Sequence, residues 1–265
     1  MRKVKFHYNY PLNIDLSSNK TVNVYIYRSF GRKTVRNSET RILILEEPKI
    51  SGIYMFAQKN EKYYTHLLTF HEDLLLTNSK ARLFNCVDSW VKNYVFTEKQ
   101  FNVSTVVGGK EDFTMKGYAL RHTLWNYKDL IRIPKRFYLS SNYKWEKVSY
   151  HNQLVLGESK VPMFDSMFHI AIENTFIANY FSEKLVDCFQ TKTVPIYLGC
   201  TNIEKYFNVD GIIRVSDVGE IVEACNKLTP ELYEKMKPAM EDNYNRSMNW
   251  IDHDKQIENA IIKLI

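Results

Sequence analysis

Hydrophobic and polar residues alternate in short runs over the first third of the chain. Runs of this kind, rich in β-branched and aromatic residues and bounded by turn formers, are typical of β-strands. They predict strands within residues 3–10, 21–28, 41–48 and 66–70. The stretch at residues 46–66 is too interrupted to be a single element. The first part of the chain is therefore expected to consist of short strands joined by turn-rich connectors.

Beyond residue 98 the pattern changes, because strand-type runs now alternate with helix-type segments. Leu120, Leu124 and Tyr127 recur at helical spacing, for example. The pattern predicts strands at residues 101–109, 136–140, 168–174, 193–199 and 211–217, and helices at residues 115–131, 181–191 and 218–228 and beyond Pro230. This alternation is typical of parallel βαβ units, which bind ligands at the carboxyl ends of their strands.

The polar stretch at residues 92–100 separates the two patterns. We therefore predict an N-terminal domain at residues 1–98 and a C-terminal domain at residues 99–265 that ends in a helical tail. Trp250, in this tail, is expected to pack back onto the body of the domain. Two modest α/β domains that share a cleft are typical of a nucleotide-binding architecture.

Composition and charge narrow the class of partner. Hydrophobic residues make up 45% of the chain and charged residues 25%, as in ordinary soluble domains. A net charge of +6 and a pI near 8.9 favour an anionic partner, and a nucleotide satisfies this as well as nucleic acid does. A nucleic-acid-binding module would need Lys and Arg clustered among aromatic residues, and the chain shows no such cluster.

Cysteine usage and hydropathy indicate the compartment. The four cysteines, Cys86, Cys188, Cys200 and Cys225, show neither a CxxC pair nor the spacing of a zinc site, so they are expected to be free thiols. No apolar run is as long as a membrane span, and the N-terminal residues lack the apolar core of a signal peptide. The chain is therefore expected to be soluble and cytoplasmic.

Polar residues gather where the strand at residues 168–174 ends. Glu173 and Asn174 fall at its carboxyl end, where open α/β sheets bind ligands. Burial of polar groups there would be costly without partners. These two residues therefore indicate a binding site.

The next helix is expected to begin after Ser182, a favourable N-cap residue, with Glu183 and Lys184 in its first turn. The helix N-terminus and the Lys184 ammonium favour an anion such as a diphosphate, and the Glu183 carboxylate is suited to sugar hydroxyls. The alternative is a first-turn acid beside a solvated lysine.

The stretch at residues 168–199 closely resembles the donor-binding signature of glycosyltransferase family 10, the α1,3/4-fucosyltransferases. In that family a strand ending in FEN(S/T) is followed by Y(V/I)TEK, a helix and (T/V)VP(V/I)xxG. The spacing is kept without a gap, while Ile172 and Ser182 replace the usual Phe and Thr. The matching residues are Glu173, Asn174, Thr175, Tyr180, Ser182, Glu183, Lys184, Val194, Pro195 and Gly199.

The resemblance implies an α/β fold of the GT-B type, in which two Rossmann-like domains face a central cleft, here with a short N-terminal domain. It also implies an inverting transfer of L-fucose from GDP-fucose to a glycan hydroxyl, without a cofactor or an essential metal. The expected partners are thus a nucleotide-sugar donor and a glycan or glycoconjugate acceptor. The N-terminal domain would contact the acceptor and the C-terminal domain the donor.

The resemblance assigns roles in the donor site. Lys184 would contact the diphosphate and Glu183 the ribose or sugar hydroxyls, while Asn174 and Tyr180 would shape the nucleotide pocket beside Glu173. Upstream, the run STVVGGKEDFTMKGYALRHTLW resembles the family's strand, turn and arginine-bearing helix.

In this upstream run, Arg121 would be a second diphosphate ligand, since a guanidinium suits two phosphate oxygens. The alternative for Arg121 is an exposed helix arginine. Lys110, after two glycines, is a further phosphate candidate.

An inverting transfer needs a base for the acceptor hydroxyl, and the family uses a glutamate that follows a strand of the first domain. Alignment on EEP selects Glu47, with Glu46 as the second candidate. Strand alternation sends these two side chains in opposite directions. The alternative to a base is that the two glutamates form a solvent-exposed acidic end of the strand. His71 is a third candidate base.

Other functions stay open. The same fold could use another nucleotide sugar, such as a UDP-sugar, or bind a nucleotide without catalysis. The DxD-like triplet at residues 252–254 is interpreted as a helix start and not as the metal site of a GT-A enzyme.

Overall fold

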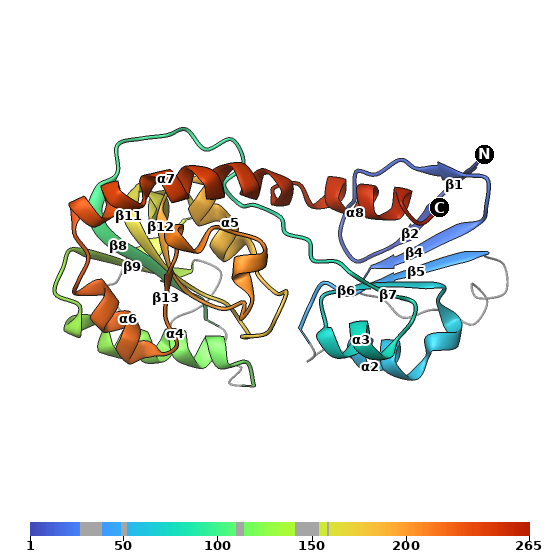
Figure 1. Cartoon of the computed structure of the whole chain (residues 1–265), viewed down its shortest axis with the longest axis horizontal. Helices are drawn as coiled ribbons and strands as arrows, with labels where there is room; N and C mark the ends of the chain where they lie inside the picture. Colours follow the sequence, from blue (N-terminus) through green and yellow to red (C-terminus); the bar gives the residue numbers. More distant parts are fainter. Residues whose placement is uncertain (27–38, 49–51, 110–113, 141–153, 158) are drawn as a thin grey trace. The chain divides into compact units, whose positions relative to one another are not determined.

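The computed structural model describes residues 1–26, 39–48, 52–109, 114–140, 154–157 and 159–265. The chain divides into two compact units (Figure 1). The first comprises residues 1–86, 178–180 and 252–265, and the second comprises residues 87–177 and 181–251. This division differs from the predicted one between residues 98 and 99, since the first unit's opening stretch ends at Cys86 and the C-terminal residues rejoin that unit.

Among the described residues, the sheet of the first unit has five parallel strands in the order β2-β4-β5-β6-β7. Four of them coincide with the predicted runs. The strands are β2 (Lys5–His7), β4 (Val22–Ile26), β5 (Thr40–Ile44), β6 (His66–Thr69) and β7 (Ala81–Leu83). A separate antiparallel pair joins β1 (Arg2–Lys3) and β3 (Ser17–Ser18).

Strand side chains of this unit alternate between two hydrophobic layers, because successive residues of a strand point to opposite faces. Val24 and Ile42 are buried in one layer, and Tyr25 and Leu43 are buried in the other. Helices α2 (Gly52–Lys59) and α3 (Glu72–Thr77) supply the second layer, and a short 3-10 turn, η1 (Glu61–Tyr63), follows α2.

The C-terminal helix α8 (His253–Ile262) completes the first layer. Its residues Ile257 and Ile261 are fully buried with the strands of the first unit, and Figure 1 shows α8 on the face opposite α2 and α3. The N-cap residue Asp252 accepts a hydrogen bond from the backbone N–H of Lys255. The triplet at 252–254 is thus a helix start, as expected, but the tail belongs to the first unit, because its apolar face fills the core there.

The second unit is built on a six-stranded parallel sheet in the order β10-β9-β8-β11-β12-β13, again counted over the residues with described positions. In chain order this is 3-2-1-4-5-6, the order of a Rossmann sheet. The strands are β8 (Gln100–Val107), β9 (Lys135–Ser140), β10 (Leu154–Leu156), β11 (Ser166–Ile172), β12 (Val194–Leu198) and β13 (Ile213–Arg214).

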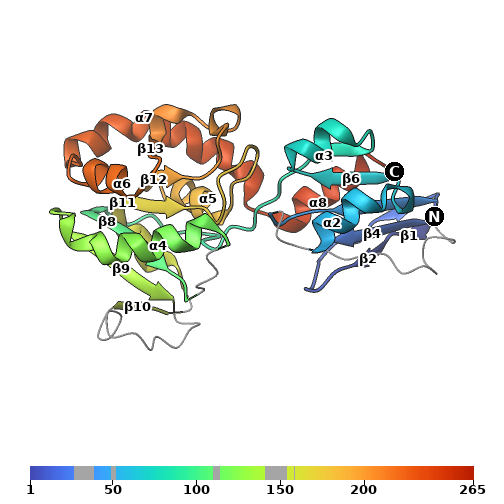
Figure 2. The same cartoon turned by 90° about the horizontal axis from the view of Figure 1, so that it is seen from below.

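Helices cover both faces of this second sheet. Helix α4 (Lys116–Tyr127) packs with α6 (Val218–Cys225), and α5 (Glu183–Gln190) packs with α7 (Pro230–Ser247), as Figure 2 shows from below. Short 3-10 turns lie between these elements: η2 (Lys128–Leu130), η4 (Val161–Asp165), η5 (Ile203–Lys205), η6 (Val209–Gly211) and η7 (Met248–Trp250). The sheet and these helices share one hydrophobic core.

Trp250 packs back onto the second unit, as predicted, with its ring centroid 4.9 Å from that of Phe181. The four cysteines are reduced, and three of them are buried. No helix in the described ranges is long and apolar enough to cross a membrane.

The strand order places a ligand site in the second unit. Strands β8 and β11 are neighbours in the sheet, although α4, β9 and β10 lie between them in sequence. The order in which the chain adds strands to the sheet reverses here: from β8 it runs outward to β9 and β10, then returns to the other side of β8 for β11, β12 and β13, with all strands parallel. Open α/β sheets bind ligands at the carboxyl ends of the strands at such a point. Glu173 and Asn174 directly follow β11, so they lie at this position.

Candidate functional site

Glu173 connects the end of β11 to the start of α5. The side chain is fully buried, and its backbone N–H continues the sheet by donating to the Leu198 carbonyl at 2.8 Å. One carboxylate oxygen accepts the backbone N–H of Ser182 at 2.9 Å, and the other accepts the Ser182 hydroxyl at 2.6 Å. A buried carboxylate is costly unless it is paired and hydrogen-bonded, and here both oxygens have partners.

Two glycines hold this strand end from either side. A Cβ atom on Gly117 would lie 1.8 Å from the Glu173 carbonyl oxygen, and one on Gly199 would lie 2.5 Å from the Glu173 Cγ. The Gly117 N–H also donates to the Asn174 carbonyl at 3.1 Å. The first turn of α4 therefore presses directly on residues 173–174, and only glycine fits.

The first turn of α5 presents a lysine and a glutamate together. Ser182 is the N-cap residue and accepts the backbone N–H of Lys184. The Lys184 ammonium donates to the Glu183 carboxylate at 2.9 Å and to the Ser182 hydroxyl at 3.2 Å, and it lies 3.9 Å from the Glu173 carboxylate. The Lys184 and Glu183 side chains are 26% and 20% exposed, so both reach the surface of the site.

Electrostatics favours the charged forms of this pair. Burial alone lowers the pKa of Lys184, but Glu183 and Glu173 outweigh it and raise that pKa above its usual value. Burial alone raises the pKa of Glu183, but Lys184 together with hydrogen bonds from the helix backbone and Ser182 outweighs it, and the net pKa is lowered. At Glu173 burial dominates and raises the pKa. Lys184 is therefore a permanent cation beside an ionised carboxylate.

Arg121 is buried against the end of β11 and is not an exposed helix arginine. The guanidinium donates to the Ile172 carbonyl from Nε at 3.2 Å and from Nη2 at 3.0 Å, and Nη2 also donates to the Asn174 side-chain oxygen. Its positive charge repels the Lys184 ammonium and lowers the pKa of that lysine, in opposition to the two carboxylates. The site thus holds two cations, and a bound anion would reduce the repulsion between them.

Two other residues were predicted for the donor site. Tyr180 belongs by its contacts to the first unit, where its buried ring lies 5.1 Å from the Phe70 ring. Lys110 falls outside the described residues. The structure therefore brings together Arg121, Glu173, Asn174, Glu183 and Lys184.

The candidate bases lie in the first unit and differ in environment: Glu46 and Glu47 follow β5, and His71 follows β6. Glu47 is exposed, and its backbone carbonyl contacts the His71 ring nitrogen Nε2 at 3.0 Å. Glu46 is mostly buried, and its carboxylate accepts the Tyr10 hydroxyl at 2.6 Å and contacts Nε2 of His253 at 2.9 Å. His71 is buried, so its visible role is to support the backbone of Glu47.

Sequence reasoning missed Gly117 and the bond between Ser182 and Glu173. A glycine in the first turn of a helix was the available signal, because glycine weakens a helix unless close packing requires it. Ser182 was recognised as an N-cap residue, but its second partner comes from the preceding strand and is invisible to local pattern.

Comparison with known proteins places these residues in a family context. Residues 142–262 match the profile of glycosyltransferase family 10 (fucosyltransferase), C-terminal domain. The chain is also similar to the alpha-(1,3)-fucosyltransferase FucT of Helicobacter pylori, with 28% identity over 166 residues. That match covers 60% of this chain and 34% of the relative, about a third of its length.

Solved structures show the same fold. The crystal structure of an alpha1,3-fucosyltransferase with GDP matches with a TM-score of 0.57 at 15% sequence identity. The structure of an alpha1,3-fucosyltransferase with GDP-fucose matches with a TM-score of 0.54 at 13% identity. Each match covers 93% of this chain and 78% of the solved chain. The pneumococcal O-GlcNAc transferase GtfA in complex with UDP and GlcNAc has 0.53 at 11% identity, over 91% of this chain and 56% of that one. The predicted α/β fold of the GT-B type and the predicted resemblance to family 10 are both confirmed.

Proposed function

We propose, from the match of residues 142–262 to the C-terminal domain of glycosyltransferase family 10, that this protein transfers L-fucose from GDP-fucose to a glycan hydroxyl. The observation that carries the proposal is the bonded group of Glu173, Ser182 and Lys184 at the point where the strand order reverses. It lies within the matched residues, and it presents a cation at a helix N-terminus, where a diphosphate binds well.

In the donor site, Lys184 binds the diphosphate and exchanges part of its contact with Glu183 for phosphate oxygens. Glu183 then accepts hydrogen bonds from the ribose or sugar hydroxyls. Arg121 holds the Asn174 amide and adds positive charge at the same strand end. Tyr180 and Lys110 complete the nucleotide pocket in this proposal.

The transfer inverts the configuration at the anomeric carbon of the sugar. The acceptor hydroxyl oxygen attacks that carbon from the side opposite the diphosphate, and the bond to the phosphate oxygen breaks as the glycosidic bond forms. The acceptor proton passes to the Glu47 carboxylate, and GDP leaves with the bonding electron pair. Glu47 is supported over Glu46 because Glu47 is exposed, whereas Glu46 is mostly buried.

Lys184 and Arg121 stabilise the charge of the leaving diphosphate, a role that divalent metals play in other transferases. Transfer is therefore expected to proceed without added Mg²⁺ or Mn²⁺. Strict dependence of turnover on added Mn²⁺ would contradict this part of the proposal.

A UDP-sugar is the second candidate donor. A pneumococcal O-GlcNAc transferase of the same fold was solved with UDP and GlcNAc, so the fold itself is compatible with another nucleotide. The sequence match favours fucose, because both the family profile and the Helicobacter pylori relative are fucosyltransferases.

The donor is tested by thermal melting of the protein with GDP, UDP, CMP and dTDP and their sugars. A ligand that binds only the folded state stabilises it, by about 2.7 kcal/mol at a concentration a hundredfold above Kd, and so raises the melting temperature. We expect the largest shift with GDP and GDP-fucose. A larger shift with UDP would favour the second candidate, and GDP binding without turnover on any acceptor would favour a non-catalytic binder.

A further inference from the structure

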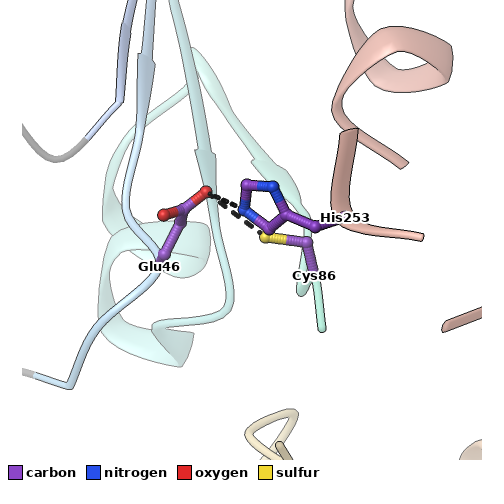
Figure 3. Close-up of side chains that lie close together, drawn as sticks. All are labelled: Glu46, Cys86 and His253. Atoms are coloured by element: carbon purple, nitrogen blue, oxygen red, sulfur yellow. Dashed lines mark hydrogen bonds and ion pairs between the residues drawn. The ribbon is translucent and has the colours of Figure 1, made fainter. Parts of the chain in front are cut away.

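Three side chains with metal-binding atoms converge inside the first unit. Glu46 follows β5, Cys86 lies beyond β7, and His253 is the first residue of α8 (Figure 3). Their ligand atoms all lie within 4.8 Å of one another. The His253 Nε2 is 2.9 Å and the Cys86 Sγ is 3.5 Å from the same Glu46 oxygen, Oε1. All three residues belong to one compact unit, so their geometry is internal to it.

Neighbouring groups orient these atoms toward a common point. The Asp254 carboxylate lies 3.2 Å from the His253 Nδ1, and Asp254 is itself held by the backbone N–H of Asn13 at 2.6 Å. Nδ1 therefore carries the ring proton, and Nε2 faces the cluster. A carboxylate on the far nitrogen of a histidine is the usual outer partner of a metal-bound imidazole.

Glu46 is oriented in the same way. The Tyr10 hydroxyl donates to Oε2 of Glu46 at 2.6 Å, which leaves Oε1 directed at His253 and Cys86. Since Nε2 and Oε1 would otherwise present lone pairs to each other, a proton or a metal ion must lie between them. The Cys86 sulfur beside the same oxygen makes the group a three-donor site.

We propose that Glu46, Cys86 and His253 bind a zinc ion. The donors are a thiolate, an imidazole and a carboxylate, a mixed set that suits Zn²⁺, whereas Mg²⁺, Ca²⁺ and Mn²⁺ prefer oxygen ligands. Zinc replaces the proton between Nε2 and Oε1 and the thiol proton of Cys86, and both protons go to solvent. Bonds of about 2.0–2.3 Å place tetrahedral ligands somewhat farther apart than a hydrogen bond does, so the Nε2 and Oε1 atoms separate slightly. A water molecule fills the fourth position.

The site lies where the chain leaves and re-enters the first unit. Cys86 is the last residue of the unit's opening stretch, and the closing stretch begins at Asp252, next to His253. Zinc at this point fastens α8 to the end of β5 and to residue 86. Its role is to stabilise the first unit, and binding of zinc by Glu46 agrees with Glu47 as the base of the proposed reaction.

The test uses the full-length chain, stripped of metal by a chelator and titrated with zinc chloride in a calorimeter. Elemental analysis after dialysis should show one zinc per chain, and zinc should raise the melting temperature. Cobalt chloride in place of zinc should give visible ligand-field bands and a thiolate-to-cobalt absorption band in the near ultraviolet.

Variants locate the site. Cys86→Ser and His253→Gln should both lose the bound zinc and the cobalt spectrum, while His66→Gln, a histidine of the same unit outside the cluster, should keep them. Asp254→Asn should weaken zinc binding by about ten- to a hundredfold, because the outer partner of the imidazole is altered. Melting of each variant without metal shows whether it is folded.

Two results would overturn the site. The first is a chain that takes up no zinc and melts at the same temperature with and without it, which would leave an ordinary hydrogen-bonded pair of Glu46 and His253. The second is zinc that stays bound in Cys86→Ser and His253→Gln, which would place it elsewhere. Neither result depends on sugar transfer, so the zinc site and the proposed function fail independently.

Discussion

At the scale of single residues, Lys184 holds the most consequential position. It is buried enough to interact strongly with two carboxylates and exposed enough to reach a ligand. Arg121 differs from it, because two of its hydrogen bonds go to a backbone carbonyl and so serve the fold as well as the charge of the site.

Lys184→Ala should abolish the thermal stabilisation by GDP, because the cation nearest the helix N-terminus is lost. Arg121→Ala should abolish it too and should also lower the melting temperature without GDP. Lys227→Ala, which removes an exposed lysine of the same unit, is the control and should leave the GDP shift unchanged. If GDP still stabilises both Lys184→Ala and Arg121→Ala, the diphosphate assignment is wrong.

Glu47→Gln should bind GDP-fucose normally and lose turnover, typically by 10²- to 10⁴-fold, since a general base contributes about that much. Calorimetric titration with GDP and a transfer assay on the same sample separate the two effects. An active Glu47→Gln enzyme would move the role to Glu46 or His71, and Glu46→Gln is the matched variant for that comparison.

At the scale of elements, the site depends on how α4 and β11 meet. Arg121 and Gly117 both come from α4, and both contact the backbone at the end of β11. The approach is so close that a methyl group would overlap the Glu173 carbonyl. A rigid junction of this kind keeps Glu173 and Asn174 in register with the first turn of α5.

Gly117→Ala should destabilise the second unit by roughly 1–3 kcal/mol, the usual cost of overpacking a core, and should weaken GDP binding with it. All four tryptophans fall within residues 87–177 and 181–251, so denaturant unfolding followed by tryptophan fluorescence reports this unit. Gly157→Ala, at an exposed position of the same unit where a Cβ meets nothing within 4 Å, is the control and should be neutral or mildly stabilising. Equal stability of Gly117→Ala and the parent chain would contradict the close contact.

Strand β11 also carries a histidine whose burial makes the second unit sensitive to acid. His169 is buried against the Ser104 hydroxyl, at 2.8 Å from Nδ1, and burial lowers its pKa to about 3. Its folded-state pKa lies below the unfolded value, so the unfolded chain binds the proton first. The contribution of neutral His169 to stability is therefore complete above about pH 6.5 and is lost as the pH falls toward 3.

Below about pH 6, we expect His169 to lower the free energy of unfolding of the second unit by nearly 1.4 kcal/mol for each pH unit. Denaturant unfolding by tryptophan fluorescence at several pH values measures it. His169→Asn, which keeps a hydrogen-bonding group near Ser104 but does not titrate, should show a shallower slope. An unchanged slope in that variant would assign the acid sensitivity to other groups.

Element assignments from the sequence succeeded where periodic runs were long. The runs at residues 101–109, 168–174 and 193–199 are strands β8, β11 and β12, because continuous apolar sequence suits a strand buried on both faces. Helix α2 and strand β10 were missed. Strand β10 spans only Leu154–Leu156, and α2 is an eight-residue helix inside the interrupted stretch at residues 46–66, so neither offers enough periods to be recognised.

At the scale of the whole molecule, the chain closes on itself through α8. Residues 252–265 are last in sequence but bury two isoleucines in the sheet formed by the first residues. The boundary predicted from the polar linker assigned these residues to the second domain, because position in the sequence does not show which of the two sheets a terminal helix packs against.

Ile257→Ala should destabilise the first unit by about 2–5 kcal/mol, the usual cost of such a truncation in a core. Hydrogen exchange of the β4 and β5 amides reports this unit separately, which matters because two units need not unfold together. Ile262→Ala, on the same helix but about half exposed, should change exchange little. If β4 and β5 exchange equally fast in the parent chain and in Ile257→Ala, α8 does not stabilise the sheet.

The sequence alone determined the local arrangement of the proposed donor site, because its residues are concentrated in one contiguous stretch at residues 168–199. There a buried strand, an N-cap and a helix start succeed each other, and local physics places Glu173, Asn174, Glu183 and Lys184 at one strand end. The tertiary structure decided what depends on segments distant in sequence. It placed α8 on the first sheet, pressed Gly117 against Glu173, and brought Glu46, Cys86 and His253 within reach of one ion. No local pattern encodes those contacts, because they arise only when whole elements pack to exclude water from their apolar faces.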